Sequence, residues 1–204
     1  AGGPVARLVF SSSVAVYGPD DAHPMPAIVD DNTLPTPQTS YGIQKFICEQ
    51  LVADYTRKGY LDGRSARLMT VTVRPGRPNG AASSFFSGII REPLNGEEAV
   101  CPVSPEVSHP VSSPQRTVDG LIAVFEASRE AFKGRMALNL PALNVRVGDM
   151  LAALEKVAGP KVRSTSARVA LKALAVQCRG GGDNGGGGVL GSCDNKASAS
   201  PPAL

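Results

Sequence analysis

The sequence has little of what metal sites, disulfide frameworks and nucleic-acid surfaces require. It contains two histidines and four cysteines, and the cysteines are widely and irregularly spaced, with no Cys-x-x-Cys pair. This spacing suits neither a zinc site nor a disulfide framework, so a reducing cytosol is the default compartment. Lysine and arginine total 21 against 18 acidic residues, without a basic run. Nucleic acid is therefore not an implied partner.

Long hydrophobic segments are also missing. No apolar run approaches the roughly 20 residues that span a bilayer, and no charged start precedes an apolar core as in a signal peptide. We therefore expect a cytoplasmic protein without a membrane partner. With 204 residues and 42% hydrophobic content, the chain is long enough for one globular domain and an appendage.

The two ends of the chain differ in character. Residues 1–160 carry the apolar patterns of a folded domain, whereas residues 161–204 are rich in Gly, Ala and Ser, with seven glycines in 180–188. A segment with so little to bury cannot offset the entropy lost on ordering, so 161–204 is expected to be a disordered tail.

A strand, a helix and a second strand are predicted in the first part of the chain. Residues 7–10 form a short apolar run that ends in hydroxyl residues, as a buried parallel strand does where a site begins. A Pro-rich loop, 18–40, leads to a helix over 41–57 that should end at Gly59. The β-branched run 68–74 predicts the next strand and so completes a βαβ unit.

Three further elements are predicted downstream. They are a helix over 118–132 capped by Thr117, a strand over 137–140 and a helix over 148–157.

Helix 41–57 carries apolar residues on two sides. Tyr41 and Lys45 share one stripe, while Ile43, Ile47 and Leu51 occupy much of the remaining circumference. A helix apolar on two sides is covered on two sides. The second cover is either another element of this chain or the same helix of a second copy, as in a homodimer.

The spacing of Tyr41 and Lys45 points to acid–base chemistry. Four residues apart on a helix, the two side chains lie on the same face. A tyrosine whose pKa is lowered by a neighbouring lysine can act as a general acid or base near neutral pH. Ser11 to Ser13 upstream offer a hydroxyl for a substrate oxygen. Serine, tyrosine and lysine in this order indicate hydride-transfer chemistry.

Three segments together resemble a known family. They are Phe-Ser-Ser-Ser-Val-Ala-Val-Tyr-Gly at 10–18, Tyr-x-x-x-Lys at 41–45, and Val-Arg-Pro-Gly at 73–76. In this order they resemble the extended short-chain dehydrogenase/reductases, the NAD-dependent epimerase/dehydratase group. Segments 73–97 and 113–122 narrow the resemblance to members that oxidise the C2 hydroxyl of a four-carbon sugar acid such as D-erythronate with NAD.

The resemblance spans about residues 5–160 and implies an α/β fold. That fold is the C-terminal part of a Rossmann-like doubly wound parallel sheet, with small substrate-binding segments.

The resemblance also implies roles for individual residues. Tyr41 would be the acid/base, Lys45 would lower the pKa of Tyr41 and bind the nicotinamide ribose, and Ser13 would hold the substrate oxygen. Ser12 takes the place of Ser13 if the register is off by one. Ser11 would lie among the cofactor-binding residues.

A loop and two arginines complete the implied site. Pro75, Gly76 and Arg77 belong to the loop that would line the nicotinamide carboxamide. The carboxylate of a sugar acid needs a cation, for which Arg91 and Arg77 are the candidates. His109 is either a hydrogen-bonding partner for a polyol or a loop histidine without a ligand.

The chain departs from the family at both ends, and at the C-terminal end the similarity stops at about residue 161. The family's dinucleotide-binding half begins with a strand and a glycine-rich turn that hold the pyrophosphate, and no such segment is present in these 204 residues. We therefore expect weak NAD binding and little activity from this polypeptide alone. Two other functions stay open: a nucleotide-sugar epimerase or dehydratase, and a non-catalytic fragment that acts through the exposed face of helix 41–57.

Overall fold

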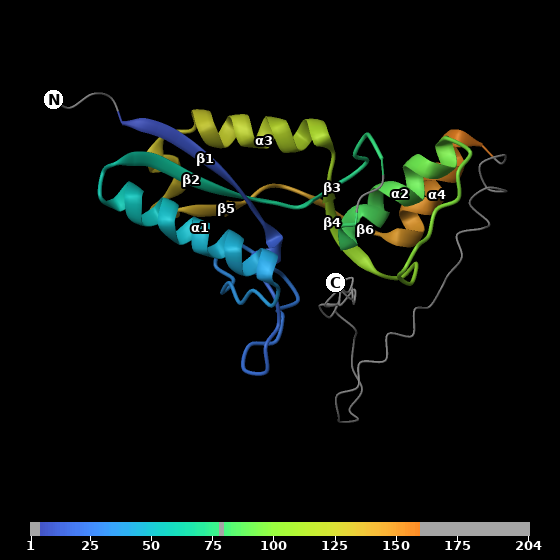
Figure 1. The fold of residues 1–204 in the computed structure, drawn as a ribbon, viewed down its shortest axis with the longest axis horizontal. Helices are drawn as coiled ribbons and strands as arrows, with labels where there is room; N and C mark the ends of the chain where they lie inside the picture. The colour runs from blue at the N-terminus through green and yellow to red at the C-terminus, as the bar shows by residue number, and fades with distance from the viewer. Residues whose placement is uncertain (1–4, 78–79, 160–204) are drawn as a thin grey trace, which may run out of the picture.

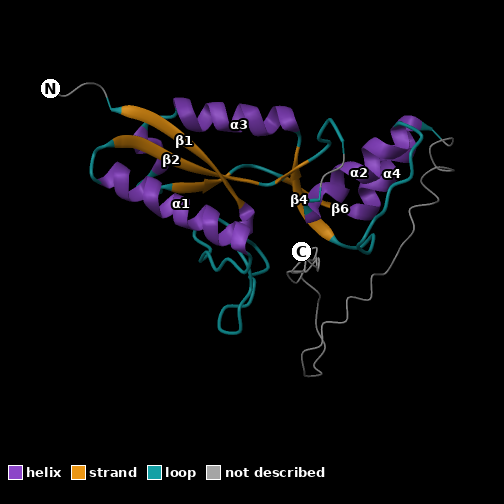
Figure 2. Cartoon of the chain, in the orientation of Figure 1, coloured by secondary structure: helices purple, strands orange, loops and turns teal. Residues whose placement is uncertain are grey.

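Two small sheets organise the residues that the computed structural model describes, 5–77 and 80–159 (Figures 1 and 2). The first sheet is parallel, in the order β1 (Ala6–Ser13), β2 (Leu61–Leu68) and β5 (Ala137–Asn139). Helix α1 (Ser40–Arg57) covers one face, and α3 (Pro114–Glu126) covers the other (Figure 1). This three-layer arrangement is Rossmann-like, as the sequence predicted.

The second sheet lies beside the first and carries two helices of its own (Figure 1). In it β3 (Thr70–Val71) pairs in parallel with β4 (Ser108–Ser112), which pairs antiparallel with β6 (Leu143–Arg146). Helices α2 (Phe85–Leu94) and α4 (Val147–Ala158) pack together against it. Three short 3₁₀ turns complete the elements: η1 (Val14–Val16), η2 (Ala82–Ser84) and η3 (Arg129–Phe132).

Helix α1 confirms the prediction for 41–57. Its N-cap is Thr39, whose hydroxyl accepts a hydrogen bond from the Gly42 amide at 3.1 Å. The helix ends at Arg57, and Gly59 follows with a φ of 77°, a left-handed conformation that glycine adopts at little cost.

The predicted strand over 68–74 was wrong. The long strand is β2, Leu61–Leu68, and only Thr70–Val71 pairs further on. The β2 sequence was missed because it is polar, although Arg64, Ser65 and Arg67 are all at most 5% exposed. Arg64 lies within 2.8 Å of carbonyl groups at the end of α3, and Arg67 pairs with an acidic residue of α1. Tertiary contacts thus stabilise a strand without β-branched residues.

The helix predicted over 118–132 also has other bounds. It begins at Pro114 with Ser113 as N-cap and ends at Glu126, because Pro at the first helical position suits a helix start. Phe132 belongs to η3 instead, while Thr117 lies inside the helix. The predictions for 137–140 and 148–157 are confirmed as β5 and α4, whereas α2, β4 and β6 were not anticipated.

Each sheet has its own buried cluster. Ala66, Val124, Phe132 and Leu140 pack under α3, and a second cluster joins α2, α4 and β4. That second cluster consists of Phe86, Ile89, Cys101, Val111, Val147 and Met150. None of the described helices is both long and apolar enough to cross a membrane. The predicted tail, 161–204, lies outside the described residues.

Candidate active site

The carboxyl ends of the three parallel strands meet at one edge of the first sheet. Ligands of open α/β sheets bind at this edge. A cavity of about 620 Å³ opens there, and residues that follow or end the strands line it: Val14 and Tyr17 after β1, Met69 after β2 and Asn139 at the end of β5. His109 of β4 closes the cavity from the second sheet.

Ser13 lies at the end of β1, next to this cavity. Its Oγ accepts a hydrogen bond from the Ala15 amide at 3.2 Å and so caps η1. A hydroxyl group keeps its own proton when it accepts, so Ser13 can still donate to a substrate oxygen. Ser12 differs from Ser13, because its side chain is 2% exposed and its hydroxyl already donates to Glu49 Oε1 at 2.5 Å. Of the two serines, Ser13 is therefore the one that a substrate can reach.

Gly42 brings the first turn of α1 against η1. A Cβ at this position would lie 2.0 Å from the Ala15 carbonyl oxygen, so no other residue fits without moving the backbone. Tyr41, its neighbour, is consequently held beside the segment that Ser13 caps. The Tyr41 side chain remains 55% exposed and open to a ligand.

Lys45 lies one turn further along α1 and is fixed by two kinds of contact. Its Nζ donates to the Ser11 carbonyl at 2.7 Å, so that a main-chain group of β1 anchors it. The same nitrogen lies 5.6 Å from the centre of the Tyr41 ring and 4.9 Å from that of Phe10. An ammonium group has three donors, and this arrangement leaves two of them for another partner.

Neither the predicted arginines nor Ser13, Tyr41 and Lys45 are among the residues that line the cavity itself. Arg91 of α2 donates to the Arg74 carbonyl at 2.8 Å and forms an ion pair with Glu92, which occupies its guanidinium. Pro75, Gly76 and Arg77 are exposed, and the rest of that loop, 78–79, is outside the described residues. Contacts with β1 and η1 bring Ser13, Tyr41 and Lys45 together, whereas Arg91 is engaged elsewhere.

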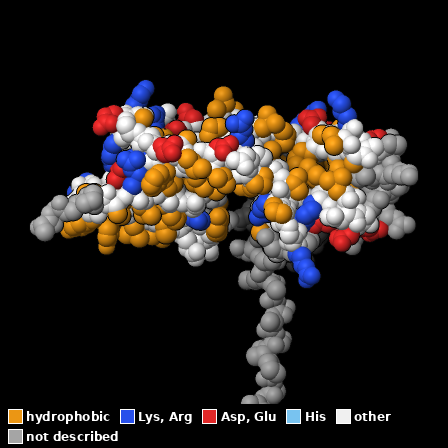
Figure 3. Space-filling view, turned by 90° about the horizontal axis from the view of Figure 1, so that it is seen from above, with side chains coloured by type: hydrophobic (Ala, Val, Ile, Leu, Met, Phe, Trp, Pro, Cys, Tyr) orange, Lys and Arg blue, Asp and Glu red, His pale blue; other side chains and the backbone are white. Residues whose placement is uncertain are grey.

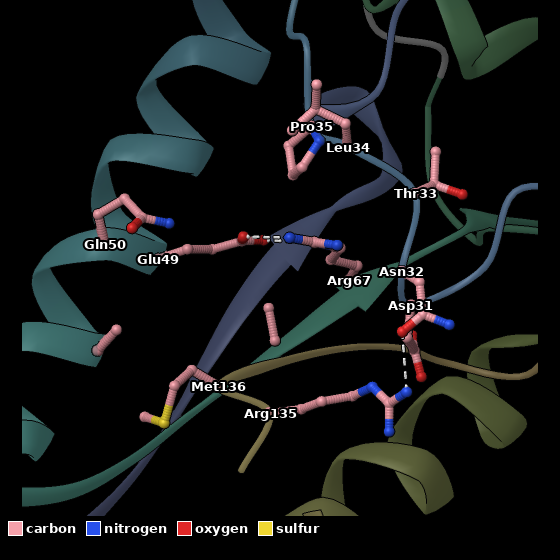
Figure 4. Close-up of a pocket in the computed structure, with 12 residues that line it drawn as sticks. Asp31, Asn32, Thr33, Leu34, Pro35, Glu49, Gln50, Arg67, Arg135 and Met136 are labelled. Atoms are coloured by element: carbon pink, nitrogen blue, oxygen red, sulfur yellow. Dashed lines mark hydrogen bonds and ion pairs between the residues drawn. The ribbon is translucent and has the colours of Figure 1, made fainter.

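A buried ion pair behind the site escaped sequence reasoning. Glu49 of α1 is 2% exposed and receives two hydrogen bonds from Arg67 of β2, at 2.9 and 2.7 Å (Figure 4). Burial disfavours the charge on Arg67, but its bonds to Glu49 and to the Tyr17 hydroxyl outweigh burial and raise its pKa. Glu49 lies one turn beyond Lys45, and that i+4 spacing was the only available signal.

His109 is placed more specifically than a loop histidine. Its ring stacks on Phe86 with centroids 4.6 Å apart, and its Nε2 lies 2.7 Å from Thr70 Oγ1. Burial lowers the pKa of His109 below its ordinary value, so the ring is neutral near pH 7.

The described residues contain no cluster of three or more metal-ligating side chains. Cys48 and Cys101 are free thiols, the first half-buried beside Lys45 and the second in the core of the second sheet.

The parallel strands, the βαβ unit and the Tyr–Lys pair at the carboxyl edge define an α/β protein of the Rossmann-like class. The model of the NAD dependent epimerase/dehydratase family matches residues 2–110, more than half of the chain. The chain belongs to this family.

Two curated relatives agree with this assignment along about half of their length. The chain is 50% identical over 156 residues to D-erythronate dehydrogenase of Cupriavidus necator, covering 76% of this chain and 47% of the relative. It is 45% identical over 159 residues to the enzyme of the same name from Haemophilus influenzae, covering 78% and 49%. The chain thus spans about half the length of the curated relatives it matches.

A solved structure is similar as well. The crystal structure of the nucleoside-diphosphate-sugar epimerase from Agrobacterium tumefaciens superposes with a TM-score of 0.73 at 46% identity. The match covers 79% of this chain and 46% of that one.

Proposed function

We propose that this chain carries the acid–base half of an NAD-dependent dehydrogenase that oxidises the C2 hydroxyl of a small sugar acid such as D-erythronate. One observation carries the proposal: Lys45 is fixed beside Tyr41 at the carboxyl end of β1, where Ser13 keeps a free hydroxyl proton. The names of the two curated relatives supply the substrate class.

Each side chain has one task in this reaction. The Ser13 hydroxyl donates to the substrate oxygen and holds it near Tyr41. Tyr41 takes the proton of the substrate hydroxyl, with Lys45 supplying positive charge beside the ring. NAD, when bound, accepts the hydride that leaves C2.

The residues present suit a nicotinamide ribose. Lys45 spends one of its three donors on the Ser11 carbonyl, and the other two suit a pair of ribose hydroxyls. Tyr41 and the Pro75–Arg77 segment are exposed, so a ligand can approach them. Arg91 and Arg77 remain the proposed partners of the substrate carboxylate. Arg91 would have to break its ion pair with Glu92 in order to bind that carboxylate.

A chimera tests the chemistry of these residues. Residues 5–160 of this chain would replace the matching segment of the Cupriavidus necator relative, and NADH formation from D-erythronate would be followed by absorbance. Tyr41→Phe should lower kcat about 10²–10⁴-fold, the usual contribution of a general acid or base. The 204-residue chain alone should form little or no NADH.

A second tyrosine of the same helix provides the control. Tyr55→Phe removes an exposed phenol that contacts only Tyr60 among the described aromatic rings, and it should leave kcat unchanged. A Tyr41→Phe chimera with nearly full activity would refute the assignment.

A nucleotide-sugar epimerase is the second candidate, because the similar Agrobacterium tumefaciens structure bears that name. UDP- and dTDP-sugars should be offered to the chimera alongside four-carbon acids. Turnover of the nucleotide sugars alone would favour the epimerase.

A further inference from the structure

We propose that His109 recognises the substrate: its Nδ1 forms a hydrogen bond with an oxygen of the small sugar acid in the cavity beside Ser13. This inference rests on the proposed function and adds a specificity-determining residue to it.

The histidine ring is held rigidly from two sides. Phe86 stacks on its face, with ring planes 18° apart, and Thr70 Oγ1 lies 2.7 Å from Nε2. The backbone of His109 is paired with Val145 of β6 in the antiparallel ladder. A ring fixed in this way loses little entropy when it binds a ligand, which is how recognition groups gain affinity.

The second ring nitrogen of His109, Nδ1, is left for a ligand. Among the described residues, Nδ1 has no hydrogen-bond partner, and it is not one of the buried polar atoms that solvent cannot reach. His109 lines the cavity, and with Nε2 beside Thr70 its Nδ1 is the ring nitrogen left for a molecule inside it.

The protonation state suits a polyhydroxy acid. The ring is neutral, so one nitrogen donates and the other accepts. If Thr70 donates to Nε2, then Nδ1 carries the proton and can donate to a hydroxyl or carboxylate oxygen. In the other tautomer, Nδ1 accepts from a substrate hydroxyl. A sugar acid offers a partner for both.

Several other polar groups of the cavity are already engaged, exposed to solvent or of the wrong charge. The Tyr17 hydroxyl accepts from Arg67 at 2.6 Å and lies 3.1 Å from Asn139 Oδ1. Glu106 is a carboxylate, which repels an acid, and its side chain is 80% exposed. Ser108 is exposed to solvent. Most of the remaining lining is apolar: Val14, Met25, Val29, Met69, Val107 and Pro110. His109 thus combines two fixing contacts with a ring nitrogen left for a ligand.

The small number of histidines makes a direct test possible. The chain contains only His23 and His109, so a protein labelled at the histidine rings gives two ring signals. His23 is exposed, pairs with Asp20 and does not itself line the cavity, so it serves as an internal control. D-erythronate would be titrated into the 204-residue protein up to millimolar concentration, the upper range of ordinary KM values. The His109 signal should shift saturably, while that of His23 should not.

Two substitutions supply the second readout, in the chimera described above. His109→Phe keeps an aromatic ring for Phe86 to stack on but has no nitrogen, and it should raise KM for D-erythronate about tenfold with kcat little changed. His109→Gln restores an amide that donates and accepts, so it should recover part of the affinity. Thermal unfolding of each variant checks that the fold is intact.

The outcomes separate this inference from the proposed function. Normal oxidation of D-erythronate by a well-folded His109→Phe chimera would overturn the inference but leave the proposed function standing. A saturable His109 shift with D-erythronate, without NADH formation by the chimera, would support the inference and contradict the proposed function. An absent His109 shift, or equal shifts of both histidines, would overturn the inference.

Discussion

Removing the Glu49 carboxylate should destabilise the protein more than any surface change. Glu49→Leu takes away the partner of Arg67, which is 5% exposed and cannot turn to solvent. It also leaves the Ser12 hydroxyl, 2% exposed, without its acceptor. The substitution therefore leaves the buried charge of Arg67 without its counter-ion and the buried Ser12 hydroxyl without its acceptor.

The expected magnitude follows from these contacts. Breaking a buried pair by removing one partner costs about 3–5 kcal/mol, because the remaining charge is uncompensated. For a chain of this size, 1 kcal/mol lowers Tm by about 2–4 °C, so Tm should fall by roughly 6–20 °C.

A triple variant distinguishes the cost of the uncompensated Arg67 charge from the cost of lost packing. Ser12→Ala, Glu49→Leu and Arg67→Met together replace the polar cluster with apolar groups, a change that is often neutral or stabilising. Urea and thermal unfolding, followed by circular dichroism, should show that the triple variant recovers most of the stability lost in Glu49→Leu. Asp54→Asn is the control, since Arg57 and Lys58 pair with Asp54 at the surface, and it should have little effect.

Two results would refute this reasoning. One is a Glu49→Leu protein as stable as the wild type, which would mean that Arg67 finds another partner or water. The other is a triple variant as unstable as Glu49→Leu, which would place the cost in packing rather than in charge.

Three further predictions concern the contact of Gly42, the half-buried His109 and the exposed face of α1. Gly42→Ala should destabilise the protein by about 1–3 kcal/mol in urea unfolding, because the new Cβ meets the Ala15 carbonyl, whereas Gly80→Ala, with open space around it, should not. The pKa of His109 is lower in the folded chain than its unfolded value near 6.5. The free energy of unfolding should therefore keep the full contribution of His109 above that pH and decline as the pH falls below it. In His109→Gln, urea unfolding at several pH values should show a weaker decline. Ile47 is 53% exposed on the apolar face of α1, so if this face joins two copies, Ile47→Glu should convert a dimer into a monomer in sedimentation velocity.

A second apolar surface accompanies the face of α1. Val118, Ile122 and Phe125 of α3 are each about half exposed, and Figure 3, which looks onto this side, shows hydrophobic side chains gathered over it. Ile43, Ile47 and Leu51 are equally exposed on α1, so the described residues of this chain do not cover the second side of that helix. A homodimer through α1 stays a prediction.

Local chemistry in the sequence was enough to predict α1 and to place Tyr41 beside Lys45. Thr39 and Gly59 bound the helix through capping and a left-handed turn, and the four-residue spacing of Tyr41 and Lys45 puts them on one face of any such helix. Ser11 to Ser13 likewise mark the carboxyl end of β1, a strand whose first residues are exposed. These features depend on neighbours along the chain, so they can be predicted from the sequence without knowledge of the fold.

The rest was decided by contacts between segments distant in sequence. Strand β2 is polar because Arg64 and Arg67 find their partners on α3 and α1, some 60 and 18 residues away. The choice of Ser13 over Ser12 depends on a hydrogen bond to Glu49, and the cavity needs Met69, His109 and Asn139 from separate elements. The sequence by itself determined the bounds of α1 and the common face of Tyr41 and Lys45. Only the tertiary structure decided which polar side chains are free, which are buried and which face a common space, because burial and pairing belong to the packed chain and not to the residue.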